Sequence, residues 1–170
     1  MSDKPLVAIT MGDAAGIGAE VTAKALQDPW VYEKCRPFVV GSVAAMDDAL
    51  RLINATGGTR LAHDVDEVRG EHGSIDVLDL ENLDFNALEY GKISPVAGQA
   101  SVEWILRAGE LAASGQVQAI ATAPINKESW QLAEMPDLGH QEVFKRLSGS
   151  DYVATMLVSG TLRCMHLSTH

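Results

Sequence analysis

The stretch "PLVAITMGDAAGIGAE", residues 5–20, joins a short apolar run to a segment with three glycines in seven residues. Leu6–Met11 has the composition of a buried strand that stops at a glycine. Gly16–Gln27 follows with a helical pattern, in which Ile17, Val21 and Ala25 are spaced by four and fall on one face. The stretch therefore predicts a strand, a tight turn and a helix in succession.

The glycines of this turn match neither standard nucleotide motif. Gly12, Gly16 and Gly18 do not fit G-x-G-x-x-G because position 21 is valine, and no Gly-Lys pair completes a phosphate-binding loop. Gly12 permits a sharp exit from the strand, and the other two let the helix start pack closely or face a ligand. Taken alone, the turn is either purely structural or lines a site, and the role of Asp13 is equally open.

The rest of the chain alternates strands with helices. This order predicts an α/β fold with three layers, α/β/α, and a largely parallel sheet with helices on both faces. The end of the chain predicts two strands joined by a turn at Ser159–Gly160. The further expected strands are Arg36–Ser42, Ile75–Leu80 and Val117–Pro124. Ile75–Leu80 is the one clear strand in residues 54–94, and Val117–Pro124 is expected to be a central strand. The expected helices are Val43–Ile53, Pro95 to about Gly115 with Ser94 as N-cap, Asn126–Ala133 and His140–Leu147.

Composition excludes several classes of protein. The 170 residues carry a formal net charge of −10, which disfavours nucleic acid as a partner. No apolar run approaches the roughly 20 residues that span a bilayer, so no membrane partner is expected. The N-terminus has no signal-peptide pattern, and a cytoplasmic location is predicted. Cys35 and Cys164 are expected to be buried free thiols.

In parallel sheets, ligands gather at the carboxyl ends of the strands, which directs attention to three loops. These loops are Gly12–Ala15, Thr122–Lys127 and the segment expected to follow His170. Asn126 is a candidate N-cap, and Lys127 would then oppose the helix dipole unless an anion compensates it. His140, at a predicted helix start, could bind or exchange a proton with a substrate oxygen. A solvated lysine and an exposed histidine remain open alternatives.

His166 and His170 have the H-x-x-x-H spacing of a helical metal pair, but the segment is typical of a strand. Four residues of extended chain separate the two by about 13 Å. Two nitrogens on one ion, each about 2.1 Å from it, cannot lie so far apart. Only one of them can belong to a given site, and His170 is the better placed of the two.

The order of five motifs is more specific than any one of them. "GDAAGIGAE", "GKISPVAGQAS", "TAPINKE", "GHQE" and "LRCMHLSTH" together resemble the first half of the 4-hydroxythreonine-4-phosphate dehydrogenase (PdxA) family. The resemblance implies a fold similar to isocitrate and isopropylmalate dehydrogenases, incomplete in this chain. It also implies NAD, a divalent metal cation (Zn, Mg or Co) held by three histidines, and a homodimer. The implied reaction oxidises and decarboxylates 4-phosphohydroxy-L-threonine in pyridoxal phosphate biosynthesis.

Carried over by position, the resemblance assigns three site residues. His140 and Gln141 take the substrate-contacting places, and His170 takes the place of a metal ligand. No NAD-binding residue falls in this chain, and the resemblance leaves the catalytic residues unassigned. Residues 1–133 would form a first lobe and 134–170 the start of a second. Because family members are longer, the chain is expected to be a fragment that binds no NAD and has no turnover by itself.

Departures from the family pattern keep other functions open. Ala14 and Ala19 stand where prolines are usual, and Gln141 stands where threonine is usual. The substitution at position 141 raises the alternative of a paralogue that oxidises threonate or erythronate 4-phosphate, or an aromatic dihydrodiol. A non-catalytic α/β module, or a small domain with no site in these loops, remains the contrasting hypothesis.

Overall fold

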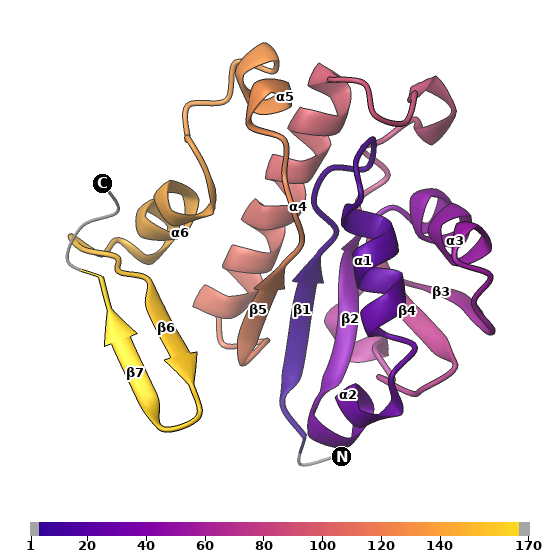
Figure 1. The fold of residues 1–170 in the computed structure, drawn as a ribbon, viewed down its shortest axis with the longest axis horizontal. Helices are drawn as coiled ribbons and strands as arrows, with labels where there is room; N and C mark the ends of the chain where they lie inside the picture. The colour runs from indigo at the N-terminus through magenta and orange to yellow at the C-terminus, as the bar shows by residue number, and fades with distance from the viewer. Residues whose placement is uncertain (1–3, 167–170) are drawn as a thin grey trace.

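The computed structural model describes residues 4–166. Its main sheet has five strands in the order β3-β4-β2-β1-β5, and every pairing is parallel (Figure 1). The carboxyl ends of all five strands therefore meet at one edge. The strands are β1 (Leu6–Thr10), β2 (Arg36–Gly41), β3 (Gly58–Ala62), β4 (Ser74–Asp79) and β5 (Ala119–Thr122).

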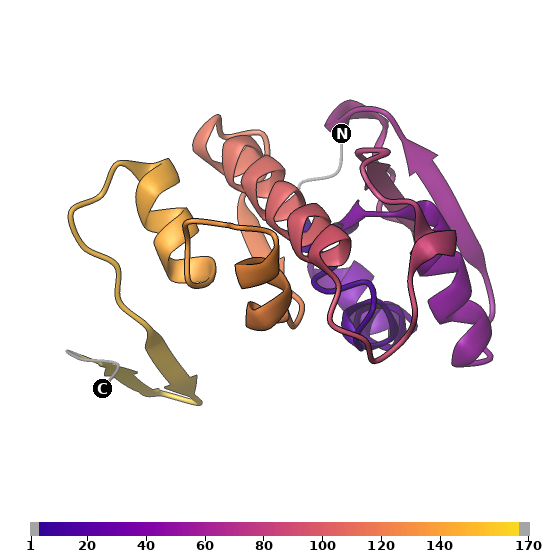
Figure 2. The same cartoon turned by 90° about the horizontal axis from the view of Figure 1, so that it is seen from above.

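Helices cover both faces of this sheet, which confirms the three-layer prediction. The chain moves outward from β1 to β2 and β3 through α1 and α3, and then returns across the sheet from β4 to β5 through α4. Right-handed crossovers in opposite directions place α4 on the face opposite α1 and α3 (Figure 2). The helices are α1 (Gly18–Ala25), α2 (Pro29–Lys34), α3 (Val43–Leu52), α4 (Pro95–Ala113), α5 (Lys127–Leu132) and α6 (His140–Ser148), with 3₁₀ turns at Val65–Glu67 and Phe85–Ala87.

The apolar stripe expected to bury α1 points the wrong way. Ile17 and Val21 are 62% and 46% exposed, and the buried residues of the helix are Gly18, Ala19, Thr22 and Ala23. A Cβ on Gly18 would lie under 3.0 Å from the carbonyl oxygen of Met11, so the helix start lies directly against the strand exit. Close approach of small residues, rather than bulk apolar area, decides which face packs.

One prediction about the strands is wrong, and one strand was not predicted. β5 is at the edge of the sheet formed by the described residues, where it pairs with β1 alone, and Ala121 and Thr122 are exposed. β3 was not predicted, because its sequence, GTRLA, has neither an apolar run nor an alternating pattern. An edge strand needs neither, since one side and much of its surface face solvent.

The predicted C-terminal strands form an antiparallel hairpin, β6 (Met156–Ser159) and β7 (Leu162–Met165). The hairpin projects away from the sheet in both views, and all its residues are exposed (Figures 1 and 2). Cys164 is therefore exposed, contrary to prediction, whereas Cys35 is half-buried; both thiols are free. Of the helices in residues 4–166, none is both long and apolar enough to cross a bilayer.

Candidate functional site

Two of the loops in which functional residues were expected, Gly12–Ala15 and Thr122–Lys127, lie side by side at the carboxyl edge of the sheet. The backbone N–H of Asp13 donates to the carbonyl oxygen of Pro124 at 2.9 Å. Gly12, with φ of +75°, passes so close that a Cβ would lie under 3.0 Å from the same oxygen. The glycine is needed for both the dihedral angle and the contact. The turn after β1 is thereby fixed to the exit of β5.

Asp13 is the buried carboxyl group of this turn, with an exposure of 5%. Its Oδ1 accepts from the backbone N–H of Ala15 at 2.8 Å, and the N–H of Gly16 donates to its carbonyl oxygen at 3.1 Å. Burial raises the pKa of the Asp13 carboxyl, and the backbone hydrogen bonds from Ala15 and Gly16 partly oppose that shift. The sequence left this residue undecided, and the structure makes it a candidate proton-accepting group.

A second contact fixes the glycine turn from the other side. The backbone N–H of Gly91 donates to the carbonyl oxygen of Ala15 at 2.7 Å. The neighbouring Tyr90 hydroxyl donates to Asp48 of α3, and Asp48 is itself paired with Arg51. This contact has no signal in the sequence, because residues 54–94 have no regular pattern.

α5 begins at the exit of β5 as predicted. The side chain of Asn126 accepts hydrogen bonds from the backbone N–H groups of Glu128 (2.9 Å) and Ser129 (3.0 Å), which confirms its role as N-cap. Lys127 is the first residue of the helix, and its side chain is exposed. A Cβ built on Gly139 would lie 3.9 Å from Lys127 Cε, so this lysine reaches the start of α6.

His140 is the first residue of α6 and lies between two aromatic rings. Its ring centroid is 6.2 Å from that of Trp130 and 6.3 Å from that of Phe144. Its Nε2 atom is buried and has no hydrogen-bond partner in the structure. Burial lowers the pKa of the His140 imidazole, and the positive charge of Lys127 lowers it further. The ring is therefore neutral at pH 7, which suits hydrogen bonding to a substrate oxygen.

Gln141 lies beside His140, but its side chain already has a partner. Its Nε2 donates to the hydroxyl of Thr155, and the backbone N–H of His166 donates to the Thr155 carbonyl oxygen at 3.1 Å. Gln141 thus connects the start of α6 to the base of the hairpin. Its predicted contact with substrate remains a prediction.

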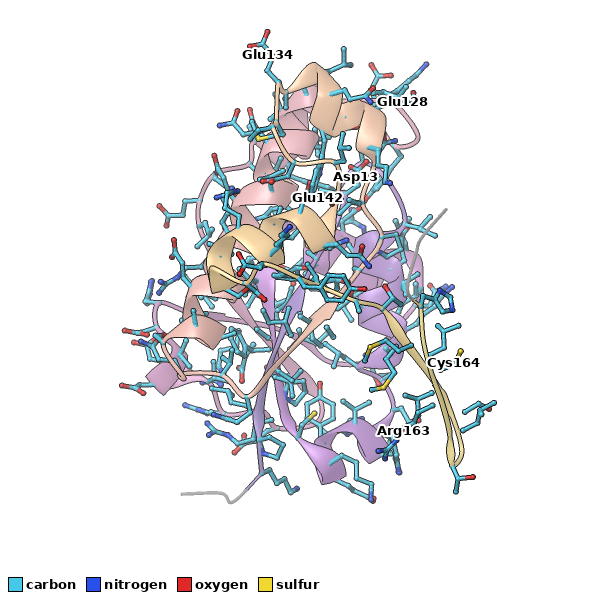
Figure 3. The ribbon with its side chains drawn as sticks, turned by 90° about the vertical axis from the view of Figure 1, so that its left-hand side faces the viewer. Asp13, Glu128, Glu134, Glu142, Arg163 and Cys164 are labelled. Atoms are coloured by element: carbon cyan, nitrogen blue, oxygen red, sulfur yellow. The ribbon has the colours of Figure 1, made fainter. Side chains whose placement is uncertain are left out.

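The third predicted site residue, His170, lies outside the described residues. Within residues 4–166, no group of three histidine, cysteine, aspartate or glutamate side chains is arranged to hold a metal ion. The described residues therefore do not by themselves fit the metal centre that the family resemblance implies. Figure 3 shows Asp13 and Glu128 near the α5 end of the molecule, whereas Cys164 lies on the distant hairpin.

The packing of α5 on α4, which positions Trp130 beside His140, was not predicted from the sequence. The indole Nε1 of Trp130 donates to Ser101 Oγ of α4 at 2.7 Å, and both side chains are fully buried. A Cβ on Gly98 would lie under 3.0 Å from the Ser129 carbonyl oxygen, so α4 and α5 are in close contact. The sequence did contain one signal for this close contact, because the small residues Gly98 and Ser101 fall on one face of α4.

Comparison with known proteins places this arrangement in a family. The sequence profile described as "Pyridoxal phosphate biosynthetic protein PdxA" matches residues 33–170. The chain belongs to the PdxA family. The match includes α6 with His140 and Gln141, and the loop that carries Lys127.

Members of the PdxA family and their structures resemble the whole chain. It is 38% identical over 170 residues to a protein of Symbiobacterium thermophilum named "Putative D-threonate 4-phosphate dehydrogenase", and covers 51% of its length. It is 41% identical to a crystal structure of a 4-hydroxythreonine-4-phosphate dehydrogenase from Burkholderia phymatum, with a TM-score of 0.93, over 99% of this chain and 51% of that one. The corresponding Klebsiella pneumoniae enzyme gives 31% identity and a TM-score of 0.89, over 99% of this chain and 52% of that one.

These PdxA-family relatives are named as dehydrogenases. The fold prediction is confirmed at the level of the family, since the described α/β/α architecture matches their structures. The chain spans about half the length of the curated relatives it matches.

Proposed function

We propose that the full polypeptide containing this chain is an NAD-dependent dehydrogenase that oxidises a hydroxyl group of a four-carbon, phosphorylated hydroxy acid. Two findings support the proposal. The chain belongs to a family in which the matched relatives are named as dehydrogenases of four-carbon hydroxy acids phosphorylated at position 4. The loops at the carboxyl edge of its sheet carry polar groups, Asp13 and Lys127, that can interact with a phosphorylated hydroxy acid.

His140 is the single observation that carries the proposal. A buried ring nitrogen without a partner is costly in a folded protein, because its hydrogen bond to water is lost and not replaced. A substrate oxygen would restore that bond. The residue stands at the start of α6, within reach of Lys127 and beside Gln141. In the proposed complex, a neutral His140 orients the substrate by one hydrogen bond.

The substrate we favour is D-threonate 4-phosphate. Its support is the name carried by the curated relatives, together with glutamine rather than threonine at position 141. A longer amide side chain that bonds to Thr155 leaves different space and different donors than a threonine would. The second candidate is 4-phosphohydroxy-L-threonine, in pyridoxal phosphate biosynthesis, which is supported by the 41% identity to the Burkholderia phymatum enzyme.

The cofactors and the assembly belong to the same proposal. NAD would accept the hydride, and a divalent cation (Zn, Mg or Co) would bind His170 together with ligands that this chain does not contain. A homodimer is proposed on the same family grounds, and the cytoplasmic location expected from the sequence is part of the same proposal. Residues 4–166 by themselves supply no set of three ligands for that cation.

The test is NADH formation by the full polypeptide with NAD, a divalent metal and each substrate separately. We expect turnover with D-threonate 4-phosphate, and a loss of kcat/KM of at least about tenfold in His140→Gln. His63→Gln is the matched control, because His63 is exposed and follows β3 at the far end of the sheet. Absence of NADH formation with every four-carbon phosphorylated hydroxy acid would overturn the proposal. Activity confined to 4-phosphohydroxy-L-threonine would favour the second candidate.

A further inference from the structure

Lys127 is a charged residue of the site to which the proposed function assigns no role. As the first residue of α5, it lies where a positive charge opposes the helix dipole. Among the ion pairs and hydrogen bonds of residues 4–166, none involves its ammonium group. A cation kept in an unfavourable position without a carboxylate partner is suited to a ligand that brings negative charge.

The side chain of Lys127 extends toward α6. Its Cε is 3.9 Å from the position of a Cβ on Gly139, and Glu142 Oε2 is 3.6 Å from the same position. Glu142 is in the first turn of α6 and is exposed. Lys127 of α5 and Glu142 of the first turn of α6 therefore both lie close to the start of α6, where His140 is the first helical residue.

The surroundings of His140 determine which residue carries the positive charge. Trp130 of α5 and Phe144 of α6 flank the ring, and α4 contributes the apolar Val102 and Ile105 to the adjoining cluster. The charged group that acts on the His140 ring is Lys127. Because burial and Lys127 both lower the pKa of His140, the imidazole is neutral where the lysine is charged.

We propose that Lys127 binds the phosphate group of the substrate and supplies the positive charge of the site, while His140 supplies an uncharged hydrogen bond. The inference rests on the proposed function for the identity of the substrate. Lysine is well suited to phosphate, since its compact ammonium group needs no fixed bidentate geometry. In a chain with a net charge of −10, the overall field does not attract a phosphate, so local donors have to hold it, and a lysine is one.

Steady-state kinetics of the full polypeptide test whether the positive charge of Lys127 binds the substrate phosphate. Lys127→Met should raise KM for the phosphorylated substrate by at least about tenfold and leave kcat nearly unchanged, because a hydrogen bond to a charged group is lost from the bound state. Lys127→Arg should restore most of the affinity. Lys145→Met is the matched control, since Lys145 is exposed in the last turn of α6. Equal KM values in wild type and Lys127→Met would overturn the proposal.

Binding of inorganic phosphate gives a readout that needs no turnover. The His140 ring signals, followed by NMR in the full polypeptide with labelled histidine, should shift on titration with phosphate but not with acetate. Lys127→Met should weaken that phosphate response at least about tenfold and raise the pKa of His140. Lys127-dependent phosphate binding without oxidation of any substrate would refute the dehydrogenase and retain this inference. A response to acetate instead of phosphate, or an unchanged His140 pKa in Lys127→Met, would refute the inference itself.

Discussion

Asp13 and Pro124 are joined by a backbone hydrogen bond of 2.9 Å, which connects the exit of β1 to the exit of β5. Most of the chain separates the two residues in sequence, yet their strands are neighbours in the sheet. The bond holds the glycine turn against the loop that leads to Lys127. Any change that separates the two loops should therefore disturb both the turn and the candidate site.

Gly12→Ala is expected to produce that separation. The new Cβ would overlap the Pro124 carbonyl oxygen, and alanine would have to adopt φ of +75°. Left-handed strain of about 1–2 kcal/mol and overpacking of about 1–3 kcal/mol together predict a loss of about 3 kcal/mol in the free energy of unfolding. Chemical denaturation monitored by tryptophan fluorescence measures this loss.

Gly115→Ala separates the two causes. Gly115 has φ of +77°, nearly the same as Gly12, but a Cβ there would meet nothing within 4 Å. We expect a loss of about 1 kcal/mol from backbone strain alone. If both alanine variants lose the same free energy, the close contact with Pro124 contributes nothing and the argument for a fixed pair of loops fails.

Asp13→Asn tests the buried carboxyl group. Asparagine keeps an Oδ1 that can accept from Ala15 but does not ionise. Because burial raises the pKa of Asp13 above its ordinary value of 3.8, the folded state holds the proton more tightly than the unfolded state. The contribution of the wild-type carboxyl to stability is therefore greatest below pH 3.8 and falls as pH rises through the folded-state pKa.

The asparagine variant should accordingly gain stability relative to wild type between pH 3.5 and pH 7. Urea denaturation at several pH values measures the difference in free energy of unfolding. Asp13→Ala serves as the comparison, because it removes the charge together with the hydrogen bond to Ala15 and should cost about 1 kcal/mol at the acidic end. A difference between Asp13→Asn and wild type that does not change with pH would show that the carboxyl ionises normally.

The sequence predicted the parts of this fold that depend on local pattern. Ser94 and Asn126 cap their helices as expected, because an N-cap is decided by residues within one turn. The apolar stripe of α1 predicted the wrong buried face, because the helix packs through Ala19 and Ala23 on its opposite face. Edge strand β3 could not be predicted, since pairing with β4, rather than its own composition, makes it a strand.

The candidate site was predictable in position but not in its supports. Parallel strands bring the two loops to one edge, so Gly12 and Lys127 could be placed together from pattern alone. The partners of His140 could not, because Trp130 and Ser101 come together only through packing of α5 on α4. The contact of Gly91 with Ala15 likewise arises from a segment without periodicity.

Trp130 and Ser101 provide a test of that packing. Trp130→Phe keeps most of the ring but removes the indole donor, and leaves the buried Ser101 hydroxyl without that partner. Ser101→Ala removes the acceptor. Each single variant should lose about 1–3 kcal/mol in the free energy of unfolding, and the double variant less than the sum, with a coupling of about 1 kcal/mol. Additive losses in a double-mutant cycle would contradict the hydrogen bond.

His140 predicts how stability depends on pH. Its pKa in the folded state is lower than the ordinary 6.5, mainly because of burial and secondly because of Lys127. The unfolded chain therefore binds a proton more readily, and the contribution of His140 to stability is present above pH 6.5 and lost as pH falls through the folded-state pKa. His140→Gln removes the titrating group while keeping a polar side chain of similar reach.

Denaturation of wild type and His140→Gln at pH 7.5 and pH 5 measures this contribution. Wild type should lose more free energy of unfolding over that interval than the glutamine variant, because only wild type has a histidine at position 140 that binds a proton more readily in the unfolded chain than in the folded one. His63→Gln controls for the loss of an exposed histidine, and should follow wild type. If all three proteins lose the same free energy, His140 titrates as it would in water. Neither its enclosure by Trp130 and Phe144 nor the field of Lys127 would then hold it neutral.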